Sequence, residues 1–108
     1  MERINEADWK VLRKLRQGAL ERFCERVLSE VVRLAAEPNQ TNHERYLAVH
    51  KLLQKQDKKL GNMFDNPKRS EALLQLALMR SRDLFTEEEY ARFSPETRAR
   101  LQRLVDLA

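Results

Sequence analysis

Three polar residues spaced seven apart are the first candidates for chemistry: His43, His50 and Asp57. Seven residues make two helical turns, so the three side chains would point the same way from one helix. An imidazole can serve as acid, base or metal ligand near neutral pH, and a carboxylate can orient it. Two turns separate successive members by roughly 10 Å, so no two reach one atom unaided. We therefore expect hydrogen-bonded or solvated side chains here, with no catalytic and no metal-ligating residue, and keep a metal-binding or catalytic role of these three residues as the least favoured hypothesis.

The other reactive motifs are incomplete. His43-Glu44 is not followed by a second His at the position of the zinc protease pattern, which Leu47 occupies. Neither Gly18 nor Gly61 has a second Gly nearby, which excludes a glycine-rich phosphate loop. We predict that the protein is not an enzyme and holds no cofactor.

Cysteine use points the same way. The single Cys excludes an internal disulfide and any metal motif that needs paired Cys. Cys24 lies at the edge of an apolar stripe in the middle of a predicted helix, a position that does not activate a thiol as a nucleophile. We expect it to be a small core residue.

Length and charge favour one soluble domain. The chain has 108 residues, 21 Lys and Arg, 17 Asp and Glu, and a net charge of +4. This size suits a single domain over residues 1–108. No apolar run approaches the roughly 20 residues of a membrane helix, and the first residues are polar and acidic, unlike a signal peptide. We expect a cytoplasmic protein that does not bind membranes.

Amino-acid composition and helix-capping signals predict helices. Leu occurs 17 times against 10 for Val, Ile and Thr together, and there are only 2 Gly and 3 Pro. Caps, capping boxes and prolines mark the boundaries of the predicted helices. The first predicted helix covers about residues 5–36, and the second begins at Thr41 and ends between residues 60 and 64. A third helix begins at Asn66-Pro67. A short fourth helix runs from Thr86 to near Phe93, and a fifth begins at Ser94-Pro95. The fold class is therefore all-α, a small bundle of about five helices, three longer and two short at the C-terminus.

The third predicted helix has the widest apolar surface of the five. Residues 72–79 are apolar except for Gln75, and together they take up well over half of the helix circumference. Such a helix lies in the centre of its bundle or meets another subunit. An Asp in place of Leu76 should therefore unfold the domain or break the assembly.

One set of side chains forms a possible interaction surface. Arg16 lies on the apolar arc of the first helix, where its stem can cover apolar surface while the guanidinium reaches water, or where it can meet a partner. Trp9 either seals the core or is an exposed anchor. The residues of this surface are Trp9, Arg13, Arg16, Leu76 and Met79. We expect a non-catalytic protein–protein interaction module, with a homodimer as the favoured assembly.

A basic patch is the basis of the alternative function. Five lysines on the first two helices could attract nucleic acid if the fold brought them together: Lys10, Lys14, Lys51, Lys55 and Lys58. A net charge of +4 is modest for binding that depends on neutralising phosphates. Ordinary solvated helix faces also explain these charges, so a nucleic-acid-associated regulator is the second hypothesis.

Overall fold

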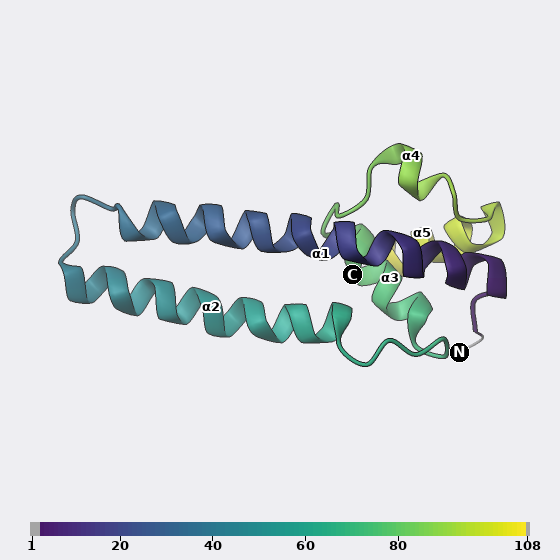
Figure 1. Ribbon diagram of the computed structural model, residues 1–108, viewed down its shortest axis with the longest axis horizontal. Coiled ribbons are helices and arrows are strands. Elements are labelled where there is room, and N and C mark those ends of the chain that lie inside the picture. Colours follow the sequence, from purple (N-terminus) through teal and green to yellow (C-terminus); the bar gives the residue numbers. More distant parts are fainter. Residues whose placement is uncertain (1–2, 108) are drawn as a thin grey trace.

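The computed structural model describes residues 3–107 and contains five α-helices and no strand within that range. The fold is all-α, as the sequence predicts, and Figure 1 shows the arrangement. The helices are α1 (Glu6–Ala35), α2 (Asn42–Phe64), α3 (Ala72–Ser81), α4 (Glu87–Tyr90) and α5 (Pro95–Leu107). None of the five is both long enough and apolar enough to cross a lipid bilayer.

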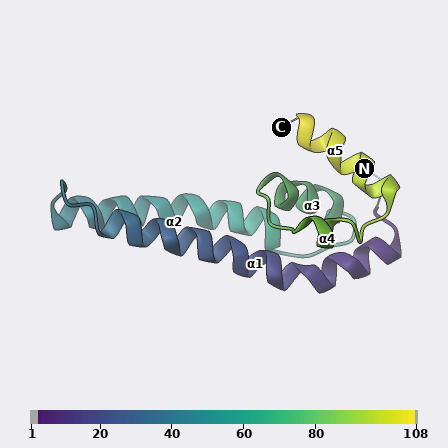
Figure 2. The same cartoon turned by 90° about the horizontal axis from the view of Figure 1, so that it is seen from above.

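Helices α1 and α2 form a long antiparallel hairpin, and the other three helices gather at one end of it (Figures 1 and 2). Helices α1 and α2 begin at the predicted caps. The Asn5 side chain accepts a hydrogen bond from the amide of Asp8, and Thr41 and Glu44 form both hydrogen bonds of a capping box. The molecule measures 51 × 25 × 24 Å, and its radius of gyration is 16.4 Å. A compact chain of this length would have about 13 Å, so the hairpin extends well beyond a globular outline.

The core occupies only one end of the hairpin. Every buried residue of the described chain lies within 4–23 or 63–101. Beyond Phe23 on α1, and before Met63 on α2, no side chain is buried. We call residues 3–23 and 63–107 the head, and residues 24–62 the arm.

Helix α3 is central in the head, as its apolar sequence predicts. Leu76 has no exposed surface, and six of the ten residues of α3 are buried. Among the partly exposed residues of this helix is Leu74. The prediction that Leu76 contributes to an interaction surface is therefore wrong, because this side chain is enclosed by the core of its own head.

The start of α3 also differs from the prediction. The helix begins at Ala72, because Asn66 has a φ of 48°, whereas a capping residue needs extended backbone. Arg69 instead ties the preceding segment to the N-terminus through a hydrogen bond from its Nε to the Ile4 carbonyl, at 3.0 Å. With ten residues, α3 is shorter than the thirteen-residue α5, so the predicted division into three longer and two short C-terminal helices is wrong in this detail.

A buried carboxylate joins the first turns of α1 and α5. Asp8 is only 2% exposed and accepts hydrogen bonds from the amide and hydroxyl of Ser94, at 2.8 and 2.7 Å. The hydroxyl of Thr97 and the amide group of Asn5 also donate to it. Burial would raise the pKa of Asp8, but the hydrogen bonds from Thr97, Ser94 and Asn5 together outweigh it and lower that pKa.

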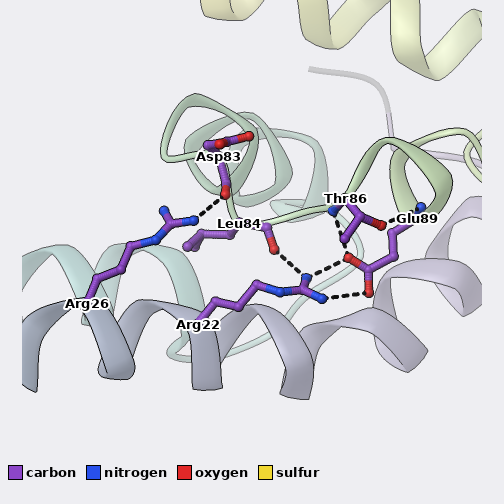
Figure 3. Close-up of polar contacts among 6 residues, drawn as sticks. All are labelled: Arg22, Arg26, Asp83, Leu84, Thr86 and Glu89. Carbon is purple, nitrogen blue, oxygen red and sulfur yellow. Dashed lines mark hydrogen bonds and ion pairs between the residues drawn. The ribbon is translucent and has the colours of Figure 1, made fainter. Parts of the chain in front are cut away.

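Two arginines of α1 hold the turn between α3 and α4 (Figure 3). Arg22 donates to the Leu84 carbonyl at 2.9 Å and to both carboxylate oxygens of Glu89, while Arg26 donates to the Asp83 carbonyl at 2.7 Å. The hydrogen bond from Arg22 is the main reason why the pKa of Glu89 is lowered. Because Glu89 also closes the capping box with Thr86, one ion pair fixes both the turn and the start of α4.

Candidate interaction surfaces

The arm has an apolar face that nothing in the described chain covers. Leu28 of α1 and Leu53 of α2 line one shallow groove with a volume of about 260 Å³. Val32 follows Leu28 by one turn and Tyr46 precedes Leu53 by two turns, so both lie on the same side as the groove. We call this surface the arm face, made of Cys24, Leu28 and Val32 from α1 with Tyr46, Leu53 and Leu60 from α2. Gln56 and Asp57 of α2 also line its groove.

The arm face lies on the side of the hairpin opposite to α3. A separate groove on the other side is lined by Arg26 of α1, Leu52 of α2 and Arg82 at the end of α3. Figure 2 shows α3, α4 and α5 together on one side of the hairpin. The head therefore leaves the arm face open along its length.

Cys24 lies between this face and the core, against which it packs. It is a free thiol with intermediate exposure, and it lines the groove beside Leu28. The expectation of a small core residue is met only in part: Cys24 packs against the core but is not fully buried, because the last buried residue of α1 is Phe23.

Of the polar residues with seven-residue spacing, Asp57 lines the groove of the arm face together with Cys24. His43, His50 and Asp57 are all exposed on α2. The ring of His50 stacks on that of Tyr46, with centroids 6.4 Å apart and planes 5° from parallel. Within residues 3–107, no group of three or more His, Cys, Asp and Glu side chains could hold a metal ion.

The second surface is a groove in the head. It has a volume of about 370 Å³ and lies between the N-terminal part of α1 and α3. We call it the arginine groove; its lining residues are Trp9, Leu12, Arg13, Arg16, Pro67, Gln75 and Met79. Four of the five residues predicted for an interaction surface meet here, and Leu76 is the exception.

Arg16 has an unusual environment in this groove. Its Nε is buried and has no hydrogen-bond partner among the described residues. The guanidinium carbon lies 6.0 Å from the centroid of the Phe64 ring, which it faces. The stem covers apolar surface as predicted, but one donor of the guanidinium is cut off from water.

The five basic residues do not form one patch. Phe64 contacts both Arg16 and Phe23, which fixes the level at which α2 ends alongside α1. Lys58 is then roughly 15 Å or more from Lys14 along the hairpin, and Lys51 and Lys55 are farther away. This separation exceeds the distance over which salt screens exposed charges, about 8 Å under physiological conditions. Lys10 forms an ion pair with Glu6 at 3.8 Å.

Comparisons with protein-family models, with curated proteins and with solved structures find no match to this chain. We therefore infer its function from its residues and their geometry alone.

Proposed function

We propose that the protein is a non-catalytic helical interaction module that forms a homodimer through the arm face. The observation that carries this proposal is a two-helix arm whose apolar face has no covering layer. Leu28 and Val32 are 61% and 68% exposed, and Tyr46 is as exposed as Val32. An apolar patch of this kind on a small protein marks a site of association.

The shape of the arm favours a second copy as the occupant. Two helices cannot enclose a core, whereas two such arms packed face to face form a four-helix bundle, in which each face is buried by its counterpart. A twofold axis uses the same patch twice, so one exposed face is enough for a closed dimer.

The size of the face predicts a weak dimer. From Cys24 to Ala35, α1 spans about 18 Å, and two adjacent helices are about 20 Å wide. Each copy thus contributes about 360 Å², and a pair about 720 Å², well below the roughly 1,200 Å² at which standard stable interfaces begin and in the range of weak, transient contacts. We expect association in the micromolar range, with dimers at high protein concentration and monomers at low concentration.

Light scattering on a size-exclusion column tests this proposal over a range of protein concentrations. The wild-type mass should rise from monomer toward dimer as the concentration increases. Leu28→Glu should remain folded, because the side chain is exposed, and should remain monomeric, because it places a charge in the buried centre of the dimer. Leu74→Glu is the matched control, since Leu74 is 50% exposed on α3, outside the arm.

A wild-type protein that stays monomeric at about 100 µM would exclude the proposed dimer, since micromolar association predicts mostly dimer there. Equal dissociation by Leu28→Glu and Leu74→Glu would place the interface elsewhere. A cytoplasmic location belongs to this proposal and stays a prediction.

A further inference from the structure

The arginine groove exists because α2 is shorter than α1. Helix α2 ends at Phe64, beside Arg16 and Phe23, so the first three turns of α1 continue without it. Trp9, Arg13 and Arg16 line the groove from α1, on the side that faces α2 farther along the hairpin. Pro67 and Met79 close the other wall, which leaves a slot beside the end of α2.

The charge in this slot is unbalanced. Arg13 and Arg16 both line it, and none of its seven lining residues is acidic. The structure gives neither guanidinium a hydrogen bond or ion pair to another described residue, and the Nε of Arg16 is also buried. A buried donor without a partner destabilises the folded state, and an acceptor brought by a ligand would remove that penalty.

We propose that the arginine groove binds a short acidic segment of a partner protein. A carboxylate lies between Arg13 and Arg16, and a neighbouring apolar side chain packs against Trp9 and Met79. Guanidinium groups match the planar, two-oxygen geometry of a carboxylate, and the apolar walls require a ligand that also brings apolar surface. A free phosphate or a nucleic-acid backbone brings none. This site lies in the head, away from the arm face, so it does not depend on the proposed dimer.

Trp9 gives a direct signal for binding, because it is the single Trp of the chain and lines the groove. The probe is a peptide of about twelve residues composed only of Glu, Leu and Phe. Titration at low salt should change the Trp9 fluorescence in a saturable way. The same peptide with every Glu replaced by Gln, inorganic phosphate and a single-stranded DNA oligonucleotide are the comparison ligands, and each should bind at least tenfold more weakly.

Two variants test the site. Arg13→Gln should weaken peptide binding about tenfold, because it removes one guanidinium from an exposed position. Lys14→Gln is the matched control: it removes the same charge from the adjacent position on α1, which does not line the groove, and should have little effect. Arg16→Met should weaken binding at least as much, while its thermal unfolding midpoint is no lower than that of the wild type, because it also removes the unpaired buried donor.

Three results would overturn the proposal. Equal binding of the Glu and Gln peptides would show that the slot does not select a carboxylate. An equal loss in Arg13→Gln and Lys14→Gln would mean that net charge alone attracts the peptide. Tighter binding of phosphate or of the oligonucleotide than of the peptide would assign the arginines to phosphate instead.

Discussion

Gly18 shows how a single residue limits the stability of α1. It lies in the middle of the helix, and a Cβ built at this position has nothing within 4 Å. Gly is less favourable than Ala inside a helix by about 1 kcal/mol. The open space around Gly18 excludes a close approach of another backbone as the reason for this glycine.

Gly18→Ala should therefore raise the free energy of unfolding by about 1 kcal/mol. Urea denaturation of the two proteins measures the difference. Gly61→Ala is the control, because a Cβ at Gly61 would lie 3.1 Å from Oδ2 of Asp65 and should gain less. A loss of stability in Gly18→Ala would show that the glycine has a role that its surroundings in the fold do not reveal.

Residue types alone were enough to select much of the arginine groove. Trp9, Arg13 and Arg16 stood out because large or charged side chains lie on or near the apolar stripe of α1, and the structure brings them together. The groove itself could not be predicted, since it depends on where α2 ends beside α1. The role of Asp8 could not be predicted from local sequence either, since its partner Ser94 is 86 residues away.

At the scale of elements, local capping signals predicted helix starts well. The capping boxes at Thr41 and Thr86 are both present, because they depend only on residues three apart. The predicted start at Asn66 was wrong, because long-range contacts determine that segment: Arg69 donates to Ile4, and Gln75 donates to the carbonyl of Asp65. Where a boundary depends on tertiary contacts, a local signal is overruled.

The contact of α1 with α5 should weaken in acid. The pKa of Asp8 is lower in the folded chain than in the unfolded chain, so the unfolded chain binds more protons between the two pKa values. The stabilising contribution of Asp8 is thus complete above the unfolded pKa of about 4, and it is lost as the pH falls through the lower, folded value.

Asp8→Asn tests this contribution. At pH 7 it should lower the free energy of unfolding by about 2 kcal/mol, because it removes a charged acceptor of several hydrogen bonds. The difference from the wild type should shrink as the pH falls from 5 toward 2, since protonation of Asp8 then removes the charge from the wild-type network, which the Asn variant lacks at every pH. Urea unfolding at several pH values measures it; a difference that stays constant with pH would contradict the assignment.

At the scale of the whole molecule, the head and the arm differ in how they are stabilised. The head has a core of three layers around α3, whereas the arm is held by contacts between α1 and α2 and by its capped turn. The apolar stripe of α1 was evident from the sequence. The sequence did not show that α3, α4 and α5 would cover the hairpin only as far as Phe23. That limit follows from the short lengths of α3 and α5.

Hydrogen exchange should detect this difference. In dilute solution the amides of the arm should exchange faster than those of α3, because few apolar contacts protect them. Raising the protein concentration should slow exchange in residues 24–35 and 42–60 and leave the head unchanged, since the dimer covers only the arm face. Slowing confined to the head would contradict the proposed interface.

The turn at residues 36–41 lies at the end of the arm, and Arg45 closes it by donating to the carbonyl of Glu37. No residue of the arm is buried. Matched pairs of turns could therefore be removed from or added to α1 and α2 near this tip without altering one contact of the core. The reach of the molecule, and the area that it offers to another arm, are thus adjustable independently of the forces that keep the head folded.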